Sequence, residues 1–177
     1  MQSKNSALAV RLNIKLVLAA TVLIATVGAH AQSSWRMDKK GAAGPVAVLD
    51  LPAEGGNNRV AMLAYEYARR CSPLFTYAEI KGRQFGAGEK QMALPSGRAF
   101  GSVNGNRYTG PGAVSVYANA VEVGFGMPQD MAQIVTFGKV TSLSFVTPAG
   151  KEVSIPTRGL SEAAGAAFEA CAQRVGR

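Results

Sequence analysis

The order of apolar and polar positions divides the chain into an N-terminal apolar run and a longer region of short, alternating patterns. Alternation of apolar and polar residues is typical of strands with one buried face, and three- and four-residue apolar spacing is typical of helices. The first pattern dominates after residue 45, and the second marks the C-terminal end. We therefore predict an α+β fold of mainly antiparallel, sandwich-like β structure, with a short helix and a C-terminal helix packed on the sheet.

The beginning of this region predicts consecutive strands. Residues 45–51 form the first apolar strand, and the residues at 54–58 indicate a turn. Residues 59–70 fit a helix by composition and a strand by alternation. We favour a strand, because it leads without a turn into residues 74–80, which are rich in β-forming side chains.

Glycine dominates the middle of the chain. Eight glycines fall within the 31 residues of 82–112, which predicts turns and loops that join short strands. Within this stretch, Asn104-Gly105 predicts a hairpin turn, since both central positions of such a turn need a positive φ. The flanking strands are expected at 99–103 and 107–109.

Alternation returns in the second half and then gives way to helical spacing. The expected elements are strands at 114–117 and 121–125, a short helix over 128–138, and a hairpin of residues 140–147 and 153–155. Ser161 and Glu162 are expected to begin the last helix, as its cap and as a favourable first-turn charge. The apolar positions at helical spacing are Leu160, Ala164, Ala167, Phe168, Cys171 and Val175.

The N-terminal apolar run has the features of a secretory signal. The basic residues Lys4, Arg11 and Lys15 precede it, and no acidic residue occurs before Asp38. The run spans residues 16–29, fewer than the roughly 20 residues that a membrane-spanning helix needs. These features favour a signal peptide over an uncleaved membrane anchor.

The run ends in Ala29-His30-Ala31, a small-x-small sequence that is typical of signal cleavage. We expect cleavage after Ala31 and a periplasmic or secreted product without a transmembrane segment. The expected organisation is a signal peptide at 1–31, a flexible lead-in at 32–44 and a single β-rich domain at 45–177. Trp35 is the residue of the lead-in that could anchor it to the core.

Export also changes the charge of the protein. The whole chain has 19 Lys and Arg against 11 Asp and Glu. Three basic residues leave with the signal, so the processed chain has 16 basic and 11 acidic residues and a net charge of +5. A charge of this size is weak evidence for nucleic acid as a partner, and we do not expect one.

Cysteine and histidine usage limits the available chemistry. Cys71 and Cys171 are an even pair in a chain bound for an oxidising compartment, which favours a disulfide that holds the C-terminal helix to the body. The alternative is a reactive Cys71, whose thiolate form Arg69 and Arg70 would favour. The only histidine is His30 in the signal. The mature chain therefore lacks the imidazole that His-based nucleophilic catalysis and the common zinc hydrolases require, and we expect no catalytic residue of that kind, no metal and no cofactor.

The remaining candidate chemistry is electrostatic. The carboxylates are spread singly, with Glu66 and Glu79 as the least implausible catalytic pair. Residues 69–107 hold seven basic residues against Glu79 and Glu89, so their net charge of +5 equals that of the processed chain. This basic stretch predicts either an anion-binding surface or a solvated face. Its basic residues are Arg69, Arg70, Lys81, Arg83, Lys90, Arg98 and Arg107.

Several of these features together resemble the invasion-associated locus B type of bacterial envelope protein. They are the export signal, the tryptophan near the mature start, the run of short strands, and the terminal Gly159-Leu160-x-x-Ala163 that leads to Phe168 and Cys171. The likeness covers the C-terminal part and the overall layout, and the chain lacks the closely placed cysteines expected soon after the tryptophan. The resemblance implies an extracytoplasmic β-sandwich associated with the cell envelope, and sometimes with host interaction, and it transfers no site residue.

We therefore expect an exported, non-enzymatic binding or accessory protein of the bacterial envelope, whose partner is an unknown protein or an anionic envelope polymer. One alternative is a small carboxylate-dependent hydrolase acting on an envelope polymer, which needs two carboxylates about 5–10 Å apart. Another is an inhibitor of a secreted enzyme, which predicts a protruding loop within residues 82–112.

Overall fold

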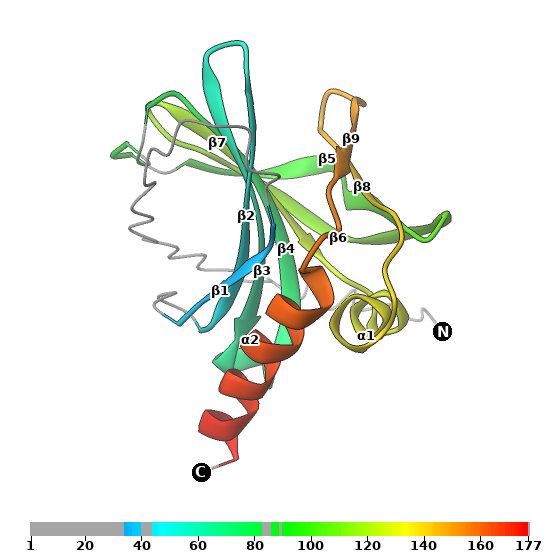
Figure 1. Ribbon diagram of the computed structural model, residues 1–177. Helices are drawn as coiled ribbons and strands as arrows, with labels where there is room; N and C mark the ends of the chain where they lie inside the picture. The colour runs from blue at the N-terminus through cyan, green and yellow to red at the C-terminus, as the bar shows by residue number, and fades with distance from the viewer. Residues whose placement is uncertain (1–33, 40–43, 83–85, 89, 177) are drawn as a thin grey trace, which may run out of the picture.

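The computed structural model describes residues 34–39, 44–82, 86–88 and 90–176, so the predicted signal peptide at 1–31 lies outside the described residues. The described chain forms one antiparallel sheet curled into a half-barrel, with two helices (Figure 1). The elements in chain order are β1 (Arg36–Asp38), β2 (Val46–Glu54), β3 (Asn57–Glu66), the 3₁₀ helix η1 (Tyr67–Arg69), β4 (Ser72–Ile80), β5 (Lys90–Val103), β6 (Asn106–Val116), β7 (Ala120–Gly126), α1 (Gln129–Phe137), β8 (Leu143–Val146), β9 (Glu152–Ile155) and α2 (Leu160–Val175).

The sheet has the order β1-β2-β3-β4-β7-β6-β5-β8-β9, with every neighbouring pair antiparallel. Mainly antiparallel β structure with two helices, one of them C-terminal, is what the sequence predicts. The sandwich is not observed, because β8 pairs with β5 and thereby joins all nine strands in one sheet. Register shifts between Leu51 and Glu54 and between Ala93 and Arg98 interrupt two ladders, and such bulges bend strands.

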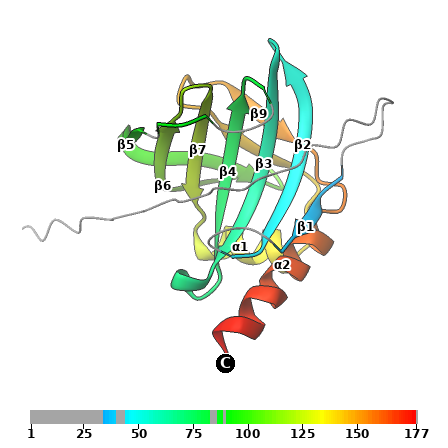
Figure 2. The ribbon, with the colours of Figure 1, turned by 90° about the vertical axis from the view of Figure 1, so that its left-hand side faces the viewer.

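The main core fills the concave side of the sheet, where both described helices pack (Figures 1 and 2). The α2 helix contacts β1, β2 and β3, and α1 packs against α2 and β5. Aromatic side chains of this core include Tyr65, Phe75, Phe125 and Phe145, each at most 2% exposed. The concave side is therefore a packed interior at the helical end of the half-barrel.

The segment between β3 and β4 differs from the expectation of a run without a turn. The short helix η1 follows Glu66, and the chain then reverses through Arg70 (φ 51°) and Cys71 (φ 63°). Residues with such angles lie in the left-handed region, which turns the chain sharply. Strands β3 and β4 therefore form a hairpin, and the strand interpretation of residues 59–66 is confirmed.

The glycine-rich region forms two long strands, not the short ones expected. Asn104 and Gly105 do form the predicted turn, with φ values of 52° and 81°. Glycine in a strand allows the backbones of neighbouring strands to approach closely. A Cβ added to Gly110 would lie 2.0 Å from the carbonyl oxygen of Gly126. Gly110 therefore marks a tight contact between β6 and β7 and does not end its strand.

Two further elements differ from their predicted form. Ser161 does not cap α2; Gly159 occupies that position with φ 74°, and the Ser161 hydroxyl donates to the carbonyl oxygen of Gly138, 3.0 Å away, at the end of α1. Within the segment expected as a flexible lead-in, Arg36–Asp38 form the edge strand β1 and Trp35 is buried. Burial of the indole fixes the start of this strand against the core.

Candidate functional site

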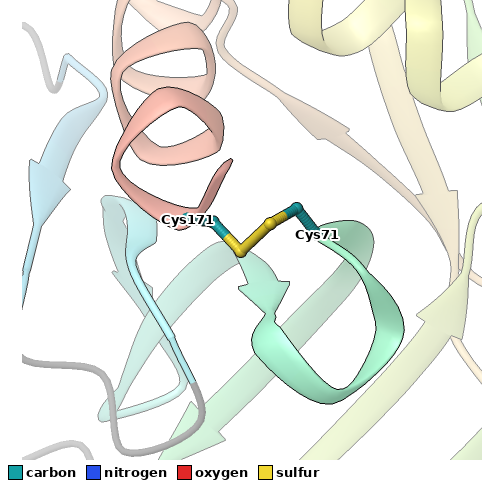
Figure 3. The surroundings of a disulfide bond; sticks show 2 residues. All are labelled: Cys71 and Cys171. Atoms are coloured by element: carbon teal, nitrogen blue, oxygen red, sulfur yellow. A yellow bond between two sulfur atoms is a disulfide. The ribbon is translucent and has the colours of Figure 1, made fainter. Parts of the chain in front are cut away.

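The two cysteines join the C-terminal helix to the β3–β4 bend. Cys71 and Cys171 form a disulfide between residues 100 positions apart, with 5.8 Å between their Cα atoms (Figure 3). Cys171 lies on the buried side of α2, and both cysteines are at most 4% exposed. Neither sulfur is a free thiol, so the reactive-cysteine alternative has no support in this structure.

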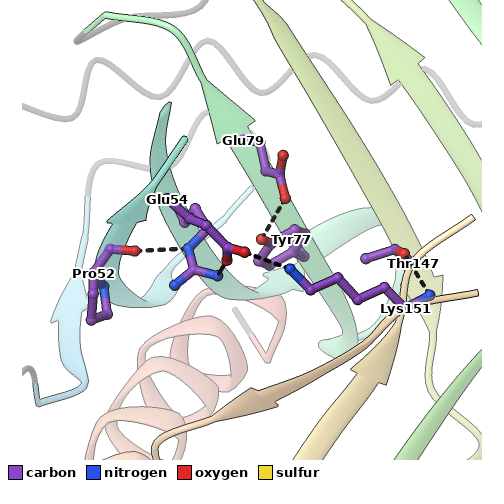
Figure 4. Close-up of polar contacts among 7 residues, drawn as sticks. Pro52, Glu54, Tyr77, Glu79, Thr147 and Lys151 are labelled. Atoms are coloured by element: carbon purple, nitrogen blue, oxygen red, sulfur yellow. Dashed lines mark hydrogen bonds and ion pairs between the residues drawn. The ribbon is translucent and has the colours of Figure 1, made fainter. Parts of the chain in front are cut away.

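A cluster of charged side chains lies at the other end of β3, between the β2–β3 and β8–β9 hairpins. We call it the mouth cluster, and it comprises Glu54, Arg59, Tyr77, Glu79 and Lys151 (Figure 4). Arg59 pairs in register with Glu79, and Tyr77 lies two residues before Glu79 on β4. The sheet therefore presents these three side chains on its concave side, with Tyr77 buried in the main core.

Glu54 is the centre of the cluster. One carboxylate oxygen accepts from Lys151 Nζ at 2.6 Å, and the other accepts from the Arg59 guanidinium. Arg59 Nε also donates to the carbonyl oxygen of Pro52 at 2.7 Å, which fixes the guanidinium against its own hairpin. Lys151 precedes β9, so its ion pair with Glu54 connects two hairpins from opposite halves of the sheet order.

The charges of the cluster set its chemistry. Hydrogen bonding and attraction from Lys151, followed by attraction from Arg59, lower the pKa of Glu54, which is therefore a carboxylate at neutral pH. Tyr77 donates to Glu79 at 2.8 Å, and burial, with a further contribution from Glu79, raises the pKa of Tyr77 to about 12. An ionised carboxylate and a neutral phenol suit recognition of charged and polar groups better than proton transfer near pH 7.

The predicted carboxylate pair is not brought together. Glu66 pairs with Ser72 at the start of β4, whereas Glu79 lies near the end of the same strand. Seven residues at about 3.3 Å each separate the two positions by roughly 23 Å. This distance is well beyond the separation at which two carboxylates flank one glycosidic bond.

The predicted basic residues are spread over both ends of the sheet. Arg70 precedes β4 and Lys81 follows it, so strand length separates them by roughly 27 Å. Lys90 lies at the same end of the sheet as Lys81. It pairs with Val116, which pairs with the start of β7, and the start of β7 lies opposite the end of β4. Arg98 lies at the β5 bulge, and Arg107 stacks over Phe100 near the β5–β6 turn, 5.1 Å from the ring centre.

Arg70, Lys81, Lys90, Arg98 and Arg107 are exposed. Arg83 lies outside the described residues, as does the side chain of Arg69. Of the described members, only Lys81 and Lys90 are placed at one end of the sheet by strand pairing.

Sequence reasoning missed the mouth cluster. Glu54 was placed in a turn, and Lys151 follows another predicted turn with no sign that the two turns meet. The available signal was the presence of opposite charges at two hairpin turns. That signal acquires meaning only when the curl of the sheet brings the turns together.

Comparison with known proteins gives no relative: no protein-family model, curated protein or solved structure matches this chain. Among the described residues, no group of three His, Cys, Asp or Glu side chains is placed to hold a metal ion. No described helix is long and apolar enough to cross a membrane.

Proposed function

We propose that the protein is an exported, non-enzymatic binding or accessory protein of the bacterial envelope and that the mouth cluster is its binding surface. The signal-like N-terminus and the disulfide both support an oxidising, extracytoplasmic compartment. The single observation that carries the binding role is the fixed array of opposite charges around Glu54, which both Arg59 and Lys151 hold in place.

The array is accessible as well as ordered. The Lys151 and Glu54 side chains are 60% and 51% exposed, whereas Arg59 is only 15% exposed and anchors the group from below. Charges that are already ordered lose little conformational freedom when a partner binds. A surface with both positive and negative groups binds a partner with the complementary pattern of charges better than a polymer with charges of one sign. The expected partner is therefore a protein with its own mixed charges.

The test compares capture from an envelope extract by the exported protein and by two charge variants. Lys151→Glu reverses a charge in the mouth cluster, and Arg107→Glu makes the same kind of change at an exposed site near the β5–β6 turn. We expect a protein partner that remains bound in high salt to lose about tenfold in affinity with Lys151→Glu and to bind Arg107→Glu normally.

The two variants also separate the competing sites. Loss of the partner with Arg107→Glu alone would assign binding to the basic stretch and contradict the mouth cluster. Salt-sensitive capture of an anionic polymer, equal for wild type and Lys151→Glu, would contradict it as well. The double variant Glu54→Lys/Lys151→Glu keeps the ion pair between positions 54 and 151 with reversed polarity but loses the bond of Glu54 to Arg59. It should fail to bind while circular dichroism still reports a folded sheet.

A further inference from the structure

The sheet ends in two edge strands, β1 and β9. The edge beyond β1 is occupied, because the backbone N–H of Trp35, just before this strand, donates to the carbonyl oxygen of Arg158 at 3.0 Å. Strand β9 pairs with β8 on one side, and no described strand pairs with its other side. The outer edge of β9 is therefore the place where the sheet can accept a further strand.

The register shows which backbone groups face this edge. The N–H of Thr147 donates to the carbonyl oxygen of Lys151 at 2.8 Å, which makes these two residues a hydrogen-bonded pair of the β8–β9 ladder. Hydrogen-bonded and non-hydrogen-bonded pairs alternate along an antiparallel ladder. Val153 therefore bonds to β8, whereas Glu152 and Ser154 direct their N–H and carbonyl groups away from it.

The same alternation continues beyond the strand, where the edge is already used. The carbonyl oxygens of Pro156 and Arg158 both accept from Trp35, one from the indole Nε1 at 2.7 Å and the other from the backbone N–H. Nearer the mouth, the side chains of Glu152 and Ser154 are exposed, and no described backbone group outside β8 bonds to these two residues. The open part of the edge therefore lies beside the mouth cluster.

The outer edge of β2, on the other side of the mouth, is protected. Strand β1 pairs only with residues 46–48 of β2, and beyond them the Asp50 side chain bonds to Arg36 at 2.7 Å. Pro52 has no N–H, and its carbonyl oxygen accepts from Arg59 Nε. Proline and charged side chains commonly protect edges against the addition of a strand. Strand β9 contains no proline, so of these two edges it is the one that can accept a strand.

We propose that the partner adds an extended segment to the outer edge of β9 as a further strand, beside the mouth cluster. This inference rests on the proposed binding role and names the form in which the partner is bound. Strand addition is a recurring mode of peptide recognition, in which backbone hydrogen bonds supply affinity and alternate side chains supply specificity. Glu152 and Ser154 each offer one donor and one acceptor to such a segment.

The side chains of β9 define the chemistry of the segment. Val153 and Ile155 belong to the main core, so the residues that pair with them lie on the same face and should be apolar. Glu152 is exposed, and a Lys or Arg directly opposite it would form a favourable cross-strand pair. The expected segment therefore alternates apolar and polar residues and carries a basic residue at its mouth end.

The mouth cluster lies at one end of this edge. Lys151 is on the same face of its hairpin as Val153, because side chains alternate along a strand. Its side chain reaches from the start of β9 to Glu54, as Figure 4 shows. A segment on β9 therefore continues to the Glu54–Lys151 ion pair, where its charged residues contact the cluster.

Amide hydrogen exchange followed by NMR tests the open edge without a partner. In the free protein the N–H of Val153 should be protected by its bond to β8, whereas those of Glu152 and Ser154 should exchange rapidly. Slow exchange at Glu152 and Ser154 in dilute protein would mean that the edge is already covered. Slow exchange that develops only as the protein concentration rises would assign the edge to a second copy of the chain. Either result would overturn the proposal.

The probe for binding is a synthetic peptide selected on the exported protein from a displayed library of short random sequences. In its complex the N–H groups of Glu152 and Ser154 should become protected. N-methylation of the peptide backbone, one residue at a time, should abolish binding at every second residue, because only alternate N–H groups face β9. A selected peptide that binds without this alternation, or a library that yields no peptide, would contradict strand addition.

A proline in β9 tests the same edge from the side of the protein. Ser154→Pro removes an N–H that faces the open edge and no bond to β8, and edge strands tolerate proline at such positions. It should weaken binding of the selected peptide and of the envelope partner about tenfold. Unchanged binding by a folded Ser154→Pro variant would overturn the proposal. If circular dichroism shows that this variant does not fold, Glu152→Pro makes the equivalent change at the first residue of β9 and decides in the same way.

Comparison with Lys151→Glu separates this inference from the proposed function. Loss of the envelope partner with Lys151→Glu but not with Ser154→Pro would keep the mouth cluster as the binding surface and overturn strand addition alone. Loss with Ser154→Pro but not with Lys151→Glu would support strand addition and contradict the mouth cluster. A partner that binds both variants normally would contradict both.

Discussion

Trp35 and Pro156 lie 121 residues apart in the sequence, and the indole Nε1 of Trp35 donates to the carbonyl oxygen of Pro156 at 2.7 Å. Trp35 precedes the first strand and Pro156 follows the last, so this bond joins the two outer edges of the sheet. The backbone N–H of Trp35 also donates to the carbonyl oxygen of Arg158 at 3.0 Å. At this end of the half-barrel the two edges are therefore held directly to each other, whereas at the mouth the Glu54–Lys151 ion pair joins the β2–β3 hairpin to the β8–β9 hairpin.

Substitution of Trp35 should destabilise the fold in two distinguishable steps. Trp35→Phe keeps an aromatic ring in the core but removes the donor to Pro156, which costs about 1–2 kcal/mol. Trp35→Ala also removes the buried ring and should cost about 3–5 kcal/mol of unfolding free energy. Urea unfolding measures both values, and equal effects of the two variants would contradict a role for the indole N–H.

Loss of the disulfide should destabilise the protein without changing its fold. The bond closes a loop of 100 residues, for which the chain-entropy model gives up to about 4.7 kcal/mol. The double variant Cys71→Ser/Cys171→Ser should therefore melt at a lower temperature than wild type and show no further change on addition of a reductant. A wild-type melting temperature that is equal with and without reductant would contradict this expectation.

Local pattern predicted much of the sheet, since alternation located residues of β2, β3, β4, β6, β7, β8 and β9 and helical spacing located α2. The apolar and polar pattern gave wrong predictions where a side chain contacts a residue that is distant in the sequence. Ser161 has the sequence signature of a cap, yet its hydroxyl donates to the carbonyl oxygen of Gly138, which follows the end of α1. A single chain position carries no information about which carbonyl the fold will bring to it.

The candidate site was harder to predict for the same reason. Glu54 and Lys151 meet because the curl of nine strands brings two turns together over 97 positions of sequence. The curl depends on bulges, and isolated residues such as Leu51 and Ala93 give no sign that a ladder shifts beside them. Charge counting therefore favoured the basic stretch, whose members the structure distributes over both ends of β4.

The strand glycines should respond to substitution according to the space around them. A Cβ at Gly110 would lie 2.0 Å from the carbonyl oxygen of Gly126, a backbone atom that cannot turn away. Gly110→Ala should therefore cost about 1–3 kcal/mol or more. Gly124→Ala is the control on the neighbouring strand, because its nearest contact is 3.8 Å away, and it should change stability by less than about 1 kcal/mol. Equal urea midpoints for the two variants would contradict the close approach of β6 and β7.

Two buried phenols should make the protein sensitive to strongly alkaline pH. Burial raises the pKa of Tyr65 to about 12, and burial together with Glu79 does the same for Tyr77. An unfolded tyrosine loses its proton near pH 10. The folded state therefore holds these protons more tightly, so the stabilisation is fully present below about pH 10 and is lost as the pH rises toward 12.

An ultraviolet titration of phenolate formation tests this directly. In the native protein the phenols of Tyr65 and Tyr77 should ionise near pH 12, and in concentrated urea all five tyrosines should ionise together near pH 10. Tyr77→Phe should remove one of the two late phenols and reduce the loss of stability between about pH 10 and 12. A native titration that is complete near pH 10 while circular dichroism still reports a folded sheet would mean that neither phenol is buried as the structure has it.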